Sequence, residues 1–156
     1  MKKIICCLLV AVMLSACGGE NKKSESRKEG EKRVGDIIMV NGELGVVFAV
    51  TTDGQHGKVM SVSATKCNWN DAKTWCANYG MGWRLPTKDE LLVISRNYDV
   101  INSALETNGY RGLGAYYWSS EISDEFCAWS VNVVGGHAVD YDKNRDDFFV
   151  RAVSAF

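Results

Sequence analysis

The sequence predicts an α+β protein in which strands at both ends of the folded region enclose helices in its middle. Three patterns support this prediction: β-branched and apolar runs over residues 36–63, apolar residues at helical spacing over residues 69–94, and alternating patterns from residue 116 onward. Because strands and helices occur in separate blocks, the sequence favours an α+β domain over repeated βαβ units.

Three strands are expected first, over residues 36–40, 44–50 and 58–63. Asn41-Gly42 separates the first two strands, and Asp53-Gly54 separates the second from the third. Asn-Gly and Asp-Gly pairs favour tight turns between antiparallel strands. The folded region is therefore expected to begin as an antiparallel meander.

Two helices are expected next, followed by a short third helix over residues 100–105. The first helix has one apolar face, which consists of Trp69, Ala72, Cys76 and Tyr79. Gly80 is expected to end it. The second helix is expected to start at Thr87, because Thr87 and Glu90 form the T-x-x-E pattern of a capping box.

The rest of the chain is expected to return to strands. Apolar and alternating runs predict them over residues 116–119, 128–133, 138–141 and 148–155. Paired glycines at Gly135-Gly136 supply one of the turns between them.

The composition is typical of a folded globular protein and argues against nucleic acid as a partner. The chain has 156 residues, of which 46% are hydrophobic and 24% charged, and its net charge is −1. Such an apolar fraction excludes wholesale disorder, and a balanced charge gives no electrostatic reason to bind nucleic acid. Residues 34–156, the expected folded domain, carry ten basic and fifteen acidic residues.

Residues 1–16 have the pattern of a secretory signal peptide, with two lysines before an apolar run. The segment Leu14-Ser15-Ala16-Cys17 resembles the lipobox of bacterial lipoproteins. That resemblance implies cleavage before Cys17 and attachment of lipid to its thiol. The alternative is an ordinary signal peptide cut near Ala16, which would leave Cys17 as a free thiol.

Residues 17–33 are expected to comprise the lipidated cysteine and an unfolded tether. Residues 18–33 contain no aromatic or aliphatic side chain, so they cannot bury enough apolar surface to fold. A basic segment lying on anionic lipid head groups is the alternative. The resemblance implies the bacterial cell envelope as the location, as an outer membrane lipoprotein of Bacteroides-like type, on either the periplasmic or the surface face.

Several motifs in the folded region occur in a characteristic order. They are GWRLPTKDEL at residues 82–91, YWSSE at 117–121, AWSV at 128–131 and VRAV at 150–153. Together they resemble the bacterial C-type-lectin-like domains of the Legionella collagen-like adhesin C-terminus and of the Fibrobacter major paralogous domain. The resemblance implies a C-type-lectin-like fold, with two helices packed on small twisted antiparallel sheets. Trp83 is expected to lock the junction between the helices, and Trp118 and Trp129 are expected to point into one core.

The resemblance places any ligand site in the long loops, over residues 108–115 and 121–125, with contributions from residues 137 and 140–147. The candidate binding residues there are Tyr110, Arg111, Tyr116, Glu121, Asp124 and His137. Tyrosine rings and an arginine can stack on or hydrogen-bond a sugar or a peptide, so the expected ligand is a glycan or a protein. Exposed loops without a ligand are the alternative.

No catalytic residue is expected, because the chain carries no nucleophile-elbow, phosphate-loop, zincin or CxxC pattern. No metal or other cofactor is expected either. Asp140, Asp142, Asn144 and Asp146 are spaced like the start of a calcium loop, but Arg145 and Arg151 stand where that loop needs glycine and glutamate. An adhesion or binding domain is therefore expected. An envelope enzyme with a fold like that of the formylglycine-generating enzymes and a structural subunit of a surface assembly are the alternatives.

Three cysteines remain in the folded region, at residues 67, 76 and 127. Export permits a disulfide, and three cysteines allow one bridge with one thiol left over. A bridge from Cys76 to Cys127 is the easier geometry, and buried free thiols are the alternative.

Overall fold

The computed structural model of the protein describes residues 30–156. The expected signal peptide, the expected lipidation site Cys17 and the tether up to residue 29 lie outside the described residues. Within residues 30–156, no helix combines the length and the apolar character needed to cross a membrane.

The first sheet contains the expected meander and is closed by the end of the chain. Its strands are β1 (Ile37–Val40), β2 (Glu43–Val50), β3 (Gly57–Ser61) and β9 (Val153–Ala155), in the order β1-β2-β3-β9. All its pairings are antiparallel. The turn between β1 and β2 has positive φ at both Asn41 (51°) and Gly42 (88°), the conformation that Asn-Gly favours.

Three helices follow the meander in the described part of the chain. They are α1 (Trp69–Tyr79), α2 (Lys88–Arg96) and α3 (Tyr98–Thr107). The Asn68 side chain accepts a hydrogen bond from the backbone N–H of Asp71 and so caps α1. The capping box predicted for α2 is present, with Thr87 and Glu90 each accepting a backbone N–H from the other.

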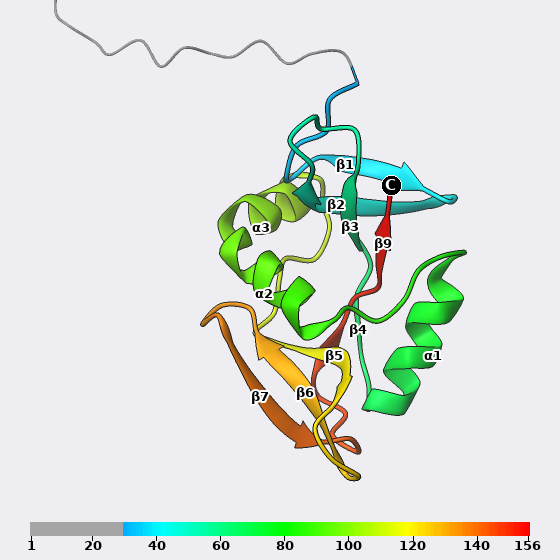
Figure 1. Ribbon diagram of the computed structural model, residues 1–156, viewed down its shortest axis with the longest axis vertical. Coiled ribbons are helices and arrows are strands. Elements are labelled where there is room, and N and C mark those ends of the chain that lie inside the picture. The colour runs from blue at the N-terminus through cyan, green and yellow to red at the C-terminus, as the bar shows by residue number, and fades with distance from the viewer. Residues whose placement is uncertain (1–29) are drawn as a thin grey trace, which may run out of the picture.

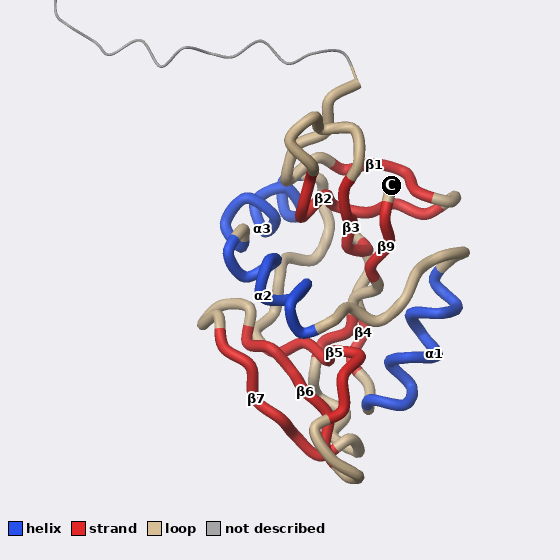
Figure 2. Tube along the Cα trace, viewed as in Figure 1, coloured by secondary structure: helices blue, strands red, loops and turns tan. Residues whose placement is uncertain are grey.

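The second sheet is built mostly from the last third of the chain. Its strands are β4 (Thr65–Lys66), β5 (Tyr116–Ile122), β6 (Cys127–Asn132), β7 (His137–Asp142) and β8 (Phe149–Val150), in the order β4-β8-β5-β6-β7. Figure 1 shows the two sheets toward opposite ends of the molecule, with α1 on one side and α2 and α3 on the other. Figure 2 shows how much of the connecting chain is loop.

The strand expected over residues 148–155 is in fact two strands in different sheets. Residues 149–150 form β8, which pairs with β4 and β5, and residues 153–155 form β9, which pairs with β3. Arg151 and Ala152 span the crossing between the sheets. The sequence pattern gives no sign of this crossing because residues on both sides of it are buried, each side against a different partner.

The core has two buried clusters, and one of the two expected core tryptophans lies outside both. Trp118 is fully buried and packs with α1 residues and Phe148 in the first cluster. Trp129 is half-buried, and the Lys88 ammonium lies 4.5 Å from the centre of its ring. The register of β5 and β6 explains why Trp129 does not point into the core as expected. Trp118 lies opposite Ser130, so Trp129 projects to the other face of the sheet.

Candidate ligand-binding site

The second sheet holds a pocket of about 310 Å³ between β4, the start of β5 and the β7–β8 connection. We call it the aromatic pocket. It is lined by Lys66, Ala115, Tyr116, Tyr141, Arg145, Asp147, Phe148 and Phe149. The β7–β8 connection lies at the end of the molecule farthest from residue 30 (Figure 1).

The rings of the pocket are held by one another and by the core. Tyr116 and Phe148 stack with ring centres 5.2 Å apart and planes inclined by 13°. Tyr141 meets both rings edge-on, at 6.0 and 4.9 Å. Phe148 also packs on buried Trp118, with ring centres 4.8 Å apart. Such contacts fix the orientation of the rings, so this wall of the pocket is preformed.

Cationic side chains cover these rings. The Arg145 guanidinium lies 5.0 Å from the centre of the Tyr141 ring and 4.8 Å from that of Phe148. The Lys66 ammonium lies 4.4 Å from the centre of the Phe149 ring. All three distances are within the range of cation–π attraction. The pocket thus combines flat apolar walls with positive charge.

One carboxylate balances part of this charge. Arg145 Nε donates to Asp147 Oδ1 at 2.6 Å, and its Nη2 donates to Oδ2 at 3.1 Å. These hydrogen bonds from Arg145 lower the pKa of Asp147 and raise the pKa of Arg145. Lys66 has no ion pair with any residue in the range 30–156, so the pocket carries a net positive charge within an acidic domain.

The structure brings two of the predicted binding residues to this pocket. Tyr116 lines it directly. Arg111 lies at its edge, with its guanidinium 4.8 Å from the centre of the Phe149 ring. Tyr110 is instead half-buried against the second core cluster, which includes Leu91, Ile101 and Leu105. Its backbone N–H donates to the Leu105 carbonyl near the end of α3.

The other three predicted binding residues lie outside the pocket lining. Glu121 accepts a hydrogen bond from the Lys88 backbone N–H at 2.9 Å, at the start of α2. Asp124 shapes the β5–β6 turn by accepting the backbone N–H groups of Phe126 and Cys127, both at 2.7 Å. His137 is the exposed first residue of β7.

Most of the lining residues are not among those predicted from the sequence to bind a ligand. Lys66 comes from β4, a two-residue strand that exists only through its pairing with β8. Arg145, Phe148 and Phe149 were placed in a loop or strand but were not predicted to bind a ligand. The available signal was the concentration of aromatic and charged side chains over residues 141–149.

The described cysteines form no disulfide, so the bridge expected from Cys76 to Cys127 is not formed. Cys76 lies on the buried face of α1, and Cys127 begins β6. Burial raises the pKa of Cys76 to about 12, and burial also raises the pKa values of Cys67 and Cys127. All three groups therefore remain protonated thiols at neutral pH, which is the unreactive form.

One group in the described residues places three possible metal ligands close together. The ligand atoms of Asp124, Cys127 and Asp140 lie within 4.8 Å of one another. Asp124 Oδ1 already accepts two backbone hydrogen bonds, and Ser123 donates to Asp140 at 3.0 Å. We assign no metal to this group.

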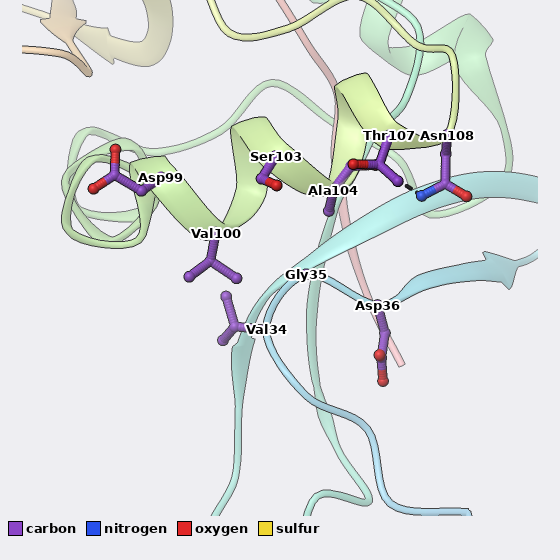
Figure 3. Close-up of a pocket in the computed structure, with 9 residues that line it drawn as sticks. All are labelled: Val34, Gly35, Asp36, Asp99, Val100, Ser103, Ala104, Thr107 and Asn108. Atoms are coloured by element: carbon purple, nitrogen blue, oxygen red, sulfur yellow. Dashed lines mark hydrogen bonds between the residues drawn. The ribbon is translucent and has the colours of Figure 1, made fainter.

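A larger and more open groove lies between residues 34–36 and α3 (Figure 3). Its volume is about 610 Å³, and its walls include Asp36, Asp99, Val100 and Ala104. The backbone of Gly35 lies so close to Val100 that a Cβ there would come within 2.9 Å of the valine side chain. The lining holds neither an aromatic ring nor a cation, so it offers less for recognition than the aromatic pocket.

The fold, with three helices packed on two small sheets in residues 30–156, is that of a C-type-lectin-like domain. The chain belongs to the Lcl C-terminal domain family, whose family model matches residues 46–154. This result confirms the family predicted from the motifs.

Two solved structures resemble the protein at low sequence identity. The crystal structure of botrocetin is 13% identical, with a TM-score of 0.43 over 62% of this chain and 90% of botrocetin. The structure of SPL-1 in complex with GlcNAc is 12% identical, with a TM-score of 0.35 over 64% of this chain and 87% of SPL-1. No curated protein sequence matches the chain.

Proposed function

We propose that the protein is a lipid-anchored adhesion module of the bacterial cell envelope, and that its aromatic pocket binds an acidic glycan. The observation that carries the proposal is the combination of stacked rings with unbalanced positive charge in one preformed pocket. Membership in a family of lectin-like domains supports a binding role.

The chemistry of the pocket favours a saccharide that bears a carboxylate or a sulfate. The apolar C–H face of a sugar ring packs well on a flat aromatic wall such as that of Tyr116 and Tyr141. Lys66 supplies a cation for the acidic group of the ligand. The planar guanidinium of Arg145 makes two hydrogen bonds to Asp147. It can release Asp147 and bind an anionic group of the ligand through the same bidentate geometry.

The state of the thiols favours binding over the alternative of a cysteine-dependent enzyme. A reactive cysteine needs a lowered pKa, yet all three described cysteines have raised pKa values. The proposal therefore gives no chemical step to Cys67, Cys76 or Cys127.

The glycan proposal predicts selective binding that depends on Arg145. The protein without residues 1–17 is expected to bind glycans with uronic acid or sulfate groups on an array, and not their neutral counterparts. Arg145→Gln removes the charged hydrogen-bond donor from the pocket, so affinity should fall about 10- to 100-fold. Surface plasmon resonance against the best array glycan measures this change.

Arg96→Gln is the matched control, because it removes the same charge from the exposed end of α2. An equal loss of affinity in both variants would point to nonspecific charge attraction and contradict a role for the pocket. Equal binding of neutral and acidic glycans would contradict the expected ligand class. Binding to matrix proteins alone would favour the protein ligand instead.

The anchor predicts a clear change in location. Lipid attachment at Cys17 should place the wild-type protein in the detergent phase of a Triton X-114 separation. Cys17→Ser removes the thiol that carries the lipid, so the variant should move to the aqueous phase. A variant that partitions with membranes as the wild type does would contradict the proposed anchor.

A further inference from the structure

The charged side chain of Arg151 is buried inside the protein. It lies at the crossing between β8 and β9 and is 1% exposed. Its Nη1 donates to the backbone carbonyls of Ser61 at 2.6 Å and Val62 at 2.8 Å. Its Nη2 donates to the carbonyl of Arg111 at 2.5 Å. One side chain therefore joins three chain segments that are distant in sequence.

No carboxylate within residues 30–156 forms an ion pair with Arg151. Its Nε has no hydrogen-bond partner in the same part of the chain. Burial of a charge without an opposite charge is costly, and an apolar side chain of similar volume would avoid that cost. The guanidinium makes three hydrogen bonds to backbone carbonyls, which an apolar side chain cannot make.

The carbonyl of Arg111 belongs to residues 108–115, the segment between α3 and β5. This segment forms neither helix nor strand. Backbone hydrogen bonds hold the segment toward its two ends, from the Tyr110 N–H to the Leu105 carbonyl and from the Val133 N–H to the Ala115 carbonyl. Between them, besides the bond to Arg151, two side chains hold its backbone. The Leu113 N–H donates to Asn102 Oδ1 at 2.7 Å, and the Gly114 N–H donates to the Tyr117 hydroxyl at 3.0 Å. Arg151 is thus the only charged donor that the described residues aim at the backbone of this segment.

The same segment covers one wall of the aromatic pocket. The side chain of Arg111 lies over the ring of Phe149, which lines the pocket. Gly114 lies against the same ring, so closely that no Cβ would fit there. The position of Phe149 therefore depends on where residues 111–114 are held.

We infer that Arg151 is a positioning residue for the aromatic pocket. By binding the carbonyl of Arg111, it holds residues 108–115 against Phe149 and so sets the shape of the pocket wall and the place of the Arg111 cation. The effect on glycan binding rests on the proposed function, whereas the ordering of the segment does not.

Limited trypsin digestion tests the ordering directly, because Arg111–Gly112 is itself a trypsin site. In the folded wild-type protein this bond should be protected. Arg151→Lys keeps the charge but cannot reach three carbonyls with the same planar geometry. The variant should be cut at Arg111–Gly112 about tenfold faster than the wild type, giving two fragments identified by mass spectrometry.

Leu85→Ala is the control for general loss of stability. It removes a buried side chain from the first core cluster without touching residues 108–115. It should raise cleavage at many sites together rather than at Arg111 alone. Selective cleavage in Arg151→Lys supports the inference. An unchanged rate in Arg151→Lys, or equally selective cleavage in Leu85→Ala, would overturn it.

Hydrogen exchange of the wild-type protein gives an answer even where Arg151→Lys does not fold. The amides of Leu113 and Gly114 should exchange as slowly as those in β5. Exchange at the rate of an unstructured chain would overturn the inference.

Binding separates this inference from the proposed function. Arg151→Lys should weaken capture of the acidic array glycan while Arg96→Gln does not. A released segment with unchanged binding would overturn the positioning role for the pocket. A wild-type protein that binds no glycan would refute the proposed function, while the digestion result would still decide whether Arg151 holds the segment.

Discussion

Replacement of Trp83 by alanine is expected to lower the free energy of unfolding by about 3–5 kcal/mol, the usual cost of truncating a large buried aromatic side chain. Trp83 is 4% exposed and lies at the junction between α1 and α2. Its ring meets that of Tyr79 edge-on at 4.9 Å, and its Nε1 donates to the carbonyl of Val40 at 3.4 Å.

Two features prevent the surrounding residues from filling the cavity that Trp83→Ala would leave. Gly45 on β2 packs so tightly on the ring that a Cβ there would lie 2.9 Å from it. The next residue, Arg84, exchanges two backbone hydrogen bonds with Val153 on β9, at 3.0 and 2.8 Å. Because both neighbours are fixed by sheet pairing, the space left by the indole stays largely empty.

Chemical denaturation measures the effect as a lower midpoint with an unchanged slope. Met81→Ala is the control, since Met81 is two residues away and 83% exposed. Its replacement should change stability by less than about 0.5 kcal/mol. A Trp83→Ala protein as stable as the Met81→Ala protein would contradict the structural role of the junction.

The second large expected effect is a loss of stability at acid pH, which we attribute to the protonation of Glu90. Burial raises the pKa of Glu90, but hydrogen bonds from Arg84, Lys58 and the Thr87 backbone outweigh it and lower the pKa to about 2. Arg84 donates to both carboxylate oxygens, at 2.8 and 2.7 Å, and Lys58 donates at 2.8 Å. The carboxylate is 6% exposed, whereas the two cations are half exposed.

A folded-state pKa below the unfolded value means that the ionised form stabilises the fold. This stabilisation is fully present above the unfolded pKa, near 4.5, and is lost as the pH falls toward 2. Since solvent screens the half-exposed cations, we expect Glu90 to contribute about 2 kcal/mol, less than its full pKa shift would give.

Glu90→Gln should therefore be about 2 kcal/mol less stable than the wild type at pH 7, and the difference should shrink toward pH 2. Urea unfolding at a series of pH values measures both curves. Asp89→Asn is the control variant. It removes an exposed carboxylate from the same helical turn, and this carboxylate has no ion pair within residues 30–156. A constant gap between Glu90→Gln and the wild type, from pH 7 to pH 2, would contradict the proposed linkage.

The sequence could predict those features that depend on residues close together along the chain. The Asn41-Gly42 turn and the capping box of Thr87 and Glu90 follow from local backbone and side-chain chemistry, and both are present. The apolar face of α1 follows from helical periodicity, and Trp69, Ala72 and Cys76 are buried as that face requires. The ordered motifs were specific enough to predict the family.

The candidate site could be predicted only in part. The loops expected to hold it included Tyr116 and Arg111, and both lie at or beside the aromatic pocket. Glu121, Asp124 and His137 were chosen by the same reasoning, yet they lie outside the pocket lining. Position in a long loop says that a side chain is accessible, but it does not say which other loop it will face.

The sequence by itself determined the α+β class, the succession of strands, helices and strands, and the family, because local patterns encode each of them. Only the tertiary structure decided which segments meet. The pairing of β4 with β8 brings Lys66 to Phe149, and the crossing from β8 to β9 places Arg151 beside the carbonyls of residues 61, 62 and 111. These contacts join residues about 40 to 90 positions apart, a separation that no short-range periodicity can encode.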